Sequence, residues 1–384
     1  MMLREIVAAV AVNLGSLSSR FASGAIIVVG VAGVVAVLLG LMAMSRGYQA
    51  VLTETAQPDR ALVMRAGREE MDGFVTNLEL GMLESISEIE ILSGEVYATL
   101  TATMRDDGSS ADVVVRGVTS DAFALRPEVQ IIAGRRFEPG RGEIIVGVGA
   151  LSMYEGLEIG DRLEVRRAEA TVVGHFTAGG TAVESEVWVD LPVAQDVYSR
   201  QGGVSVVRAR VAFDEQARVA DVIDSNPALE LELIPEVEFY ARQSADRAVL
   251  IDTFAYFVAG IMALGSVIAA LNTMYTVVSR RTIEIATLRA IGFGGSAIVV
   301  SVMIEAMLLA IVGGLIGAVC VYLALDGYAT SATGTSTQVA FAFRVTPDLI
   351  VTGLSWALAL GLLGGLLPAL RAARLPVTDA LRTG

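Results

Sequence analysis

The chain has 384 residues, of which 54% are hydrophobic, and its formal net charge is −14 at pH 7. All 28 basic residues are arginine, and there is one histidine and one cysteine. Without lysine, the chain can form neither a P-loop, whose lysine reaches the phosphates, nor a Schiff base. One histidine and one cysteine exclude an intrachain disulfide and a zinc site of the usual nitrogen and sulfur ligands. We therefore predict no catalytic residues and no metal site.

The N-terminal part predicts a membrane anchor. Residues 1–20 have apolar positions at helical spacing with sparse charge, which favours a short cytoplasmic helix on the membrane surface. Alternatively, residues 1–20 are the irregular beginning of the first membrane helix. Residues 21–45 are uncharged and long enough to cross a bilayer. They are too long for the apolar core of a signal peptide, and no clean small-residue cleavage site follows. We expect an uncleaved first span.

Residues 46–247 predict a large mixed α/β domain. They carry 35 acidic residues against 19 arginines, which gives no reason to expect nucleic-acid binding. Helical spacing covers 68–92, and further helices are expected at 191–201 and 214–225. Strand patterns bounded by turn residues occur at 95–103, 111–118, 143–148, 162–176, 186–190 and 204–213. Their two clusters suggest two subdomains, with about 117–203 inserted into a unit made from 46–116 and 204–247.

The C-terminal part predicts three further spans. Residues 236–252 contain neither glycine nor proline and run into the second span as a stalk helix. The remaining predicted segments are spans at 253–279, 297–325 and 349–370, a cytoplasmic amphipathic helix at 280–296, a short extracytoplasmic loop at 326–348 and a cytoplasmic tail at 371–384. The three segments expected in the cytoplasm carry eight arginines against three acidic residues. This balance predicts that both termini are cytoplasmic and that 46–247 is extracytoplasmic.

Several motifs have a common resemblance. Residues 279–295 read S-R-R-T-I-E-I-A-T-L-R-A-I-G-F-G-G, and E-A-M-L-L follows at 305–309. The chain closes on P-A-L-R-A-A-R at 368–374 and P-V-T-D-A-L-R at 376–382, while G-R-R-F-E-P-G, G-E-I-I-V-G, G-L-E-I-G-D and T-V-V-G-H-F punctuate 134–176. In composition and order these motifs resemble the FtsX/MacB-type permeases of the type VII ABC transporter family, along essentially the whole chain.

The resemblance implies four membrane helices with a MacB-like periplasmic domain between the first and second. It also implies a bacterial inner-membrane dimer, with a second copy or a paralogue, whose separate cytoplasmic ATPase binds ATP and Mg. The 280–296 segment would be the coupling helix that docks on this ATPase. The residues expected to carry docking are Arg281, Glu284, Ile285, Leu288, Arg289 and Gly292. From charge alone, a membrane-surface anchor would fit the same arginines.

For several other residues the sequence favours mainly structural roles. Glu305 lies inside a predicted span, where a carboxylate is costly, so we expect a structural or coupling role, with Asn272 or Thr273 as a possible polar neighbour. Two glycine pairs at helix-packing spacing predict close helix contacts: Gly313 with Gly317, and Gly361 with Gly365. His175 and Trp188 are expected to serve ordinary packing in strands.

The expected function is that of a permease subunit in an exporter or mechanotransmission complex. It would couple ATP hydrolysis to movement of the periplasmic domain, for efflux or extraction of a substrate, with a periplasmic adaptor and an outer-membrane channel as further partners. Within the same family, the alternative is an ATP-driven activator of a cell-wall hydrolase. From a different class, the alternative is a membrane-anchored sensor that needs no ATPase.

Overall fold

The computed structural model describes residues 21–68, 71, 73–166, 168–333 and 338–374. The predicted surface helix at 1–20 and most of the predicted tail at 371–384 lie outside these residues. The chain divides into two compact units, each described here by itself. The helical unit comprises Met1–Arg46, Ala248–Tyr328 and Phe343–Gly384, and the α/β unit comprises Gly47–Arg247 and Ala329–Ala342.

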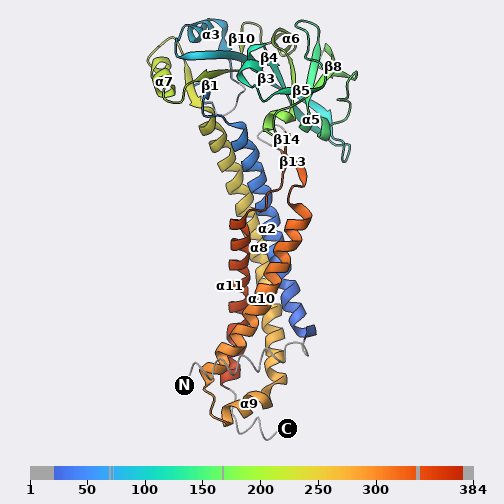
Figure 1. Ribbon diagram of the computed structural model, residues 1–384, viewed down its shortest axis with the longest axis vertical. Helices are drawn as coiled ribbons and strands as arrows, with labels where there is room; N and C mark the ends of the chain where they lie inside the picture. Colours follow the sequence, from blue (N-terminus) through green and yellow to red (C-terminus); the bar gives the residue numbers. More distant parts are fainter. Residues whose placement is uncertain (1–20, 69–70, 72, 167, 334–337, 375–384) are drawn as a thin grey trace. The chain divides into compact units, whose positions relative to one another are not determined.

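The helical unit is a bundle of four long helices (Figure 1). All four are long and apolar enough to cross a membrane: α2 (Phe21–Thr55), α8 (Glu236–Arg280), α10 (Gly295–Leu325) and α11 (Pro347–Ala373). Between α8 and α10 lies the short α9 (Thr282–Ala290). One apolar core collects side chains from all five helices. The four spans, with an α/β unit between the first and second, confirm the predicted fold class.

Both predicted glycine pairs lie at helix contacts. A Cβ atom on Gly313 would come within 2.7 Å of the Val28 carbonyl oxygen, and one on Gly317 within 2.6 Å of the Ala32 carbonyl oxygen. The α10 pair therefore faces the backbone of α2. On α11, Cβ atoms at Gly361 and Gly365 would each lie 2.7 Å from an alanine Cβ of α10. Larger side chains at these positions would force the helices apart.

The α/β unit is built on a mixed ten-stranded sheet in the order β12-β1-β11-β3-β4-β9-β6-β8-β5, with β7 paired to β8. The strands are β1 (Arg60–Arg65), β3 (Ile89–Thr103), β4 (Ser110–Val118), β5 (Gln130–Gly134), β6 (Glu143–Gly147), β7 (Arg162–Val165), β8 (Ala168–Thr177), β9 (Glu186–Asp190), β11 (Val206–Val211) and β12 (Leu231–Pro235). The short β2 (Val75–Thr76) and β10 (Gly203–Val204) pair separately. The helices are α3 (Asn77–Glu84), α4 (Asp121–Leu125), α5 (Val148–Met153), η2 (Ala182–Ser185), α6 (Leu191–Val197) and α7 (Gln216–Asp224).

The long strand β3 belongs to both halves of this sheet. Its first half pairs with β11 and its second half, from Val96, pairs with β4. The hydrophobic core beside β11 is separate from the core that Val96, Val113 and Val115 share with β6 and β9. The sequence-based subdomain boundary near residue 117 falls inside β4, whereas the cores divide near the middle of β3. The reason is that β4 pairs with both β3 and the parallel β9.

Three sequence-based expectations differ from the structure. The helix expected at 68–92 shortens to α3, because Thr76 and Glu79 form a capping box that fixes its first turn. The strand expected at 162–176 is a hairpin, β7 and β8, with Arg166 at φ 56° in its turn. In addition, the connection expected as a loop at 326–348 contains two paired strands, β13 (Ala329–Thr333) and β14 (Gln338–Ala342).

A fully buried ionic cluster lies where the two halves of the sheet meet. It contains three arginines and three glutamates: Glu95, Arg116, Arg126, Glu186, Arg208 and Glu236. Glu95 on β3 accepts from Arg116 NH1 at 2.7 Å and from Arg126 NH2 at 2.9 Å, and Arg208 Nε lies 3.4 Å away. Arg116 also forms a bidentate pair with Glu186, at 2.6 and 2.5 Å. The opposite charges balance, as buried ions require.

The same cluster includes the first turn of α8. Glu236, the first residue of this helix, accepts a hydrogen bond from Arg208 on β11 and another, at 3.1 Å, from the Gln57 backbone N–H. Arg208 NH2 also donates to the Tyr240 hydroxyl at 3.2 Å, one turn further along α8. The start of α8 is thus held in the sheet by charge-assisted bonds, which are stronger than neutral ones.

Candidate coupling site

The helix α9 has local signals at both ends. Arg281, which is not helical (φ −107°), separates α8 from α9. At the other end Gly292 has φ +109°, a backbone conformation that disfavours side chains with a Cβ. The Gly292 N–H donates to the Arg289 carbonyl and the Phe293 N–H donates to the Leu288 carbonyl, both at 3.1 Å. This is a Schellman motif, so Gly292 ends the helix and turns the chain toward α10.

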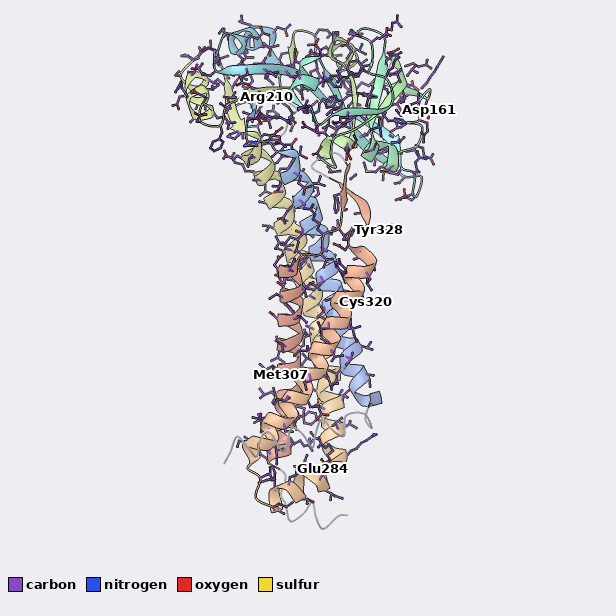
Figure 2. The ribbon with its side chains drawn as sticks, viewed as in Figure 1. Asp161, Arg210, Glu284, Met307, Cys320 and Tyr328 are labelled. Atoms are coloured by element: carbon purple, nitrogen blue, oxygen red, sulfur yellow. The ribbon has the colours of Figure 1, made fainter. Side chains whose placement is uncertain are left out.

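Arg281 joins three elements of the helical unit. Its Nε and NH2 donate to the Glu284 carboxylate at 2.9 and 2.6 Å, within the first turn of α9. Its NH1 lies 3.5 Å from Glu305 Oε2 on α10. Arg281 is buried and Glu305 is only 4% exposed. The end of α8, the start of α9 and the first half of α10 are therefore linked through one guanidinium. Figure 2 labels Glu284 on α9 and Tyr328 beyond the other end of α10.

Glu305 thus pairs with Arg281 rather than with the neighbours considered from the sequence. Thr273 instead donates its hydroxyl hydrogen to the Ala269 carbonyl at 2.8 Å. The sequence suggested Asn272 and Thr273 as polar neighbours of Glu305. It could not show that the turn between α8 and α9 brings the Arg281 guanidinium close to α10.

The other predicted docking residues are distributed around α9. Ile285 is buried in the bundle core, while Glu284, Leu288 and Arg289 are partly exposed and Gly292 is exposed. The large apolar side chains exposed here are Ile283 on α9, at 54%, and Ile291 at its C-cap, at 72%. Neither was among the predicted docking residues, although the alternation of Ile283 with Ile285 could have indicated that only one of them is buried.

His175 and Trp188 have ordinary structural surroundings. The buried His175 ring places Nε2 2.9 Å from the Leu157 carbonyl oxygen. Trp188 is fully buried on β9, and its Nε1 donates to Glu186 at 2.8 Å. Both therefore serve the packing of the α/β unit.

The fold and the site define a class of protein. Four membrane-spanning helices, an α/β domain after the first and a short helix fixed between the second and third are the parts of a transport permease. The chain belongs to the MacB/FtsX-type ABC transporter permeases, because residues 25–225 match the MacB-like periplasmic core domain and residues 256–377 match the FtsX-like permease C-terminal domain. The predicted family is confirmed, and the α/β unit is its extracytoplasmic domain.

Relatives of known name share low identity along most of the chain. A macrolide export ATP-binding/permease protein MacB from Hyphomonas neptunium is 24% identical over 376 residues, covering 92% of this chain and 57% of that protein. The MacB of Bartonella henselae is 25% identical over 333 residues, covering 80% of this chain and 48% of its own length. The chain thus spans about half the length of these relatives. The uncharacterized ABC transporter permease YknZ of Bacillus subtilis is 22% identical, covering 88% of this chain and 77% of YknZ.

Two solved structures are similar to part of the chain. The extracellular domain of the noncanonic ABC-type transporter YknZ from Gram-positive bacteria has 13% identity and a TM-score of 0.36, covering 46% of this chain and 99% of that domain. The periplasmic region of MacB from Actinobacillus actinomycetemcomitans has 8% identity and a TM-score of 0.37, covering 50% of this chain and 95% of that region.

Proposed function

We propose that this chain is the transmembrane subunit of an exporter or mechanotransmission complex. A separate cytoplasmic ATPase subunit binds ATP and Mg, and its cycle moves the extracytoplasmic domain to expel or extract a substrate. The protein lies in the bacterial inner membrane with both termini in the cytoplasm. The observation that supports this proposal best is α9, a short helix between two spans, fixed to α10 through Arg281 and exposing Ile283 and Ile291.

These 384 residues contain no lysine and therefore no nucleotide-binding P-loop, so the proposal places ATP binding outside them. We assign contact with the ATPase to Ile283 on α9 and Ile291 at its C-cap, with Glu284 and Arg289 at the rim. Arg281 and Ile285 would hold the helix in place from within.

Replacement of Ile283 by aspartate should abolish ATPase binding. A carboxylate in the apolar centre of an interface loses a buried contact and adds an unpaired charge, so we expect at least about tenfold less ATPase stimulation. Ile132→Asp is the matched control, because Ile132 is 57% exposed but lies in the α/β unit. The measurement is ATPase copurification and ATP hydrolysis by the detergent-purified complex. Equal loss in both variants, or in neither, contradicts the assignment.

A second copy of the chain would fit against α8. Six mostly exposed apolar side chains on this helix alternate in steps of four and three residues: Leu250, Phe254, Phe257, Ile261, Leu264 and Ile268. This is the heptad spacing of a helix–helix seam, whereas contact with lipid requires no such repeat. We propose that α8 pairs with α8 of the second subunit.

The α8 pairing predicts a disulfide between subunits. In a Cys320→Ala background, Ile261→Cys should form a covalent dimer in native membranes under mild oxidation. The wild-type chain is the control, because its Cys320 is also exposed but lies on α10. Non-reducing electrophoresis reads the result. A wild-type dimer with no Ile261→Cys dimer would place the interface on α10 instead.

A further inference from the structure

The strand pair β13–β14 is part of the α/β unit although it connects two membrane helices. Residues 326–328 join α10 to β13, and residues 343–346 join β14 to α11. These two linkers are hydrogen-bonded to each other: the Gly327 N–H donates to the Phe343 carbonyl at 3.0 Å, and the Val345 N–H donates to Asp326 Oδ1 at 2.9 Å. Over residues 326–333 and 338–346, the two sides of the connection are therefore hydrogen-bonded to each other.

Within the α/β unit, β14 packs against the C-terminal part of α2. Phe341 is buried, and its ring meets the buried Tyr48 ring edge-on, with centroids 5.9 Å apart. Beside it, the backbone of β14 comes so close to α2 that a Cβ on Gly47 would lie 2.1 Å from the Ala342 carbonyl oxygen. Only glycine permits this approach, because real Cβ atoms do not come so near an oxygen.

The same strand is bonded to η2. The Ala340 N–H donates to the buried Ser185 Oγ at 2.9 Å. At the other end of this four-residue segment, the Ala182 N–H donates to Thr55 Oγ, the last residue of α2, at 2.9 Å. Between them, Glu184 accepts hydrogen bonds from the Thr177 hydroxyl and from two backbone N–H groups of the adjoining loop. The segment η2 is thus hydrogen-bonded to both α2 and β14, and it is bonded to the adjoining loop through Glu184.

We propose that the connection between α10 and α11 is a working part of the extracytoplasmic domain. The strand β14 stays bound to α2 and η2 throughout the transport cycle and carries movement of α10 and α11 into this domain, in addition to the direct continuation of α2 and α8. We expect β14 to stay bound because its release would expose the buried Phe341 and Tyr48 rings and break the close backbone contact at Gly47. The mechanical part of this inference rests on the proposed function, whereas the binding of β14 does not.

A cross-link tests the binding directly. A Cβ at Gly149 on α5 would lie 3.3 Å from the Ala340 Cβ, close to the separation in native disulfides. In a Cys320→Ala background, Gly149→Cys with Ala340→Cys should therefore oxidise nearly completely within one chain, detected by the loss of maleimide-reactive thiols. Gly81→Cys with Ala340→Cys is the control, since the position of a Cβ at Gly81 in α3 is open. If both pairs stay equally reduced, the proposed binding of β14 is wrong.

The mechanical part is tested with the full permease–ATPase complex. The cross-linked chain should keep ATPase stimulation within about twofold of its reduced form, whereas Gly47→Ala should lower it by about fivefold or more. Gly33→Ala, on the same helix but with open space at its Cβ, should leave it unchanged. If Gly47→Ala does not accumulate, Ser185→Ala, which removes one acceptor, replaces it. An inactive cross-linked chain, or equal activity of the Gly47 and Gly33 variants, overturns permanent coupling through β14. If the wild-type chain stimulates no ATPase, the proposed function fails while the disulfide still reports binding.

Discussion

Replacement of Glu95 by glutamine is expected to lower the free energy of unfolding of the α/β unit by about 3–5 kcal/mol. Glu95 is fully buried and lies within ion-pair distance of Arg116, Arg126 and Arg208. Its neutral replacement leaves three buried guanidinium groups with two carboxylates, Glu186 and Glu236. An uncompensated buried cation costs far more than a neutral pair of similar volume.

The measurement is thermal unfolding of the purified full chain in detergent, followed by tryptophan fluorescence. Trp188 is buried beside the cluster, so a Trp356→Phe background makes it the reporter of the α/β unit. At roughly 2–4 °C per kcal/mol for a domain of this size, Tm should fall by about 6–20 °C. Glu169→Gln is the control, because its pair with Arg162 is exposed and should contribute at most about 1 kcal/mol. A loss no larger than that of the control would mean that the cluster is not a major source of stability.

The pH dependence of the same difference has a defined sign. Burial raises the pKa of Glu95, but attraction by Arg126, Arg116 and Arg208 outweighs burial and lowers it to about 2. In the unfolded chain a glutamate has a pKa of about 4.3. Because the folded pKa is lower, the contribution of Glu95 is fully present above the unfolded value and is lost as pH falls toward 2. The difference in Tm between wild type and Glu95→Gln should therefore be constant from pH 7 to 5 and shrink below pH 4.

The membrane spans could be predicted from the sequence because a bilayer sets a local requirement. A run such as 297–325 must be apolar over its whole length, and α10 occupies Gly295–Leu325. The strands 186–190 and 111–118 were also recognisable, since Val-rich runs are flanked by polar or turn residues. In each case the signal lies within one element.

The ionic cluster and the strand β14 could not be predicted in this way, because their partners are distant in sequence. Glu95 pairs with residues on β4, on β11 and at the end of α4. The local signal was a charged residue among valines, as at Arg116 and Arg208. The segment 326–348 is rich in Ser, Thr and Gly, which favours a loop. The strand β14 is stabilised by distant residues, since Phe341 packs against Tyr48 and the Ala340 N–H donates to Ser185.

The candidate site was only partly predictable for a related reason. Similarity of the 279–295 motif gives the position of α9 in the chain, but it does not distinguish its buried side chains from its exposed ones. Arg281 was expected to contact an ATPase, and the structure buries it between α9 and α10. The positioning role that we propose for it depends on the carboxylate of Glu305, which lies on a different helix.

Replacement of Arg281 by glutamine should uncouple the permease although this side chain is buried. The variant leaves Glu305, at 4% exposure, without its guanidinium inside the bundle. Removal of one partner from a buried ion pair costs about 3–5 kcal/mol. We expect loss of ATPase stimulation by more than about tenfold, because the start of α9 is no longer bonded to α10 and its exposed face shifts. Arg280→Gln, at the neighbouring exposed position, is the control.

The paired variant distinguishes positioning from direct contact. With Glu305→Gln added, the buried carboxylate on α10 is replaced as well, and the two amides can hydrogen-bond to each other; Glu284 also loses the guanidinium but is partly exposed. If Arg281 acts by holding α9 on α10, the double variant should recover a large part of the ATPase stimulation, with a coupling energy of about 1–3 kcal/mol between the two sites. If Arg281 instead contacts the ATPase, Glu305→Gln cannot restore activity and the two losses should add. Bilayer-embedded samples are preferable for this comparison, since the charge of Glu305 carries its full cost only where water is excluded.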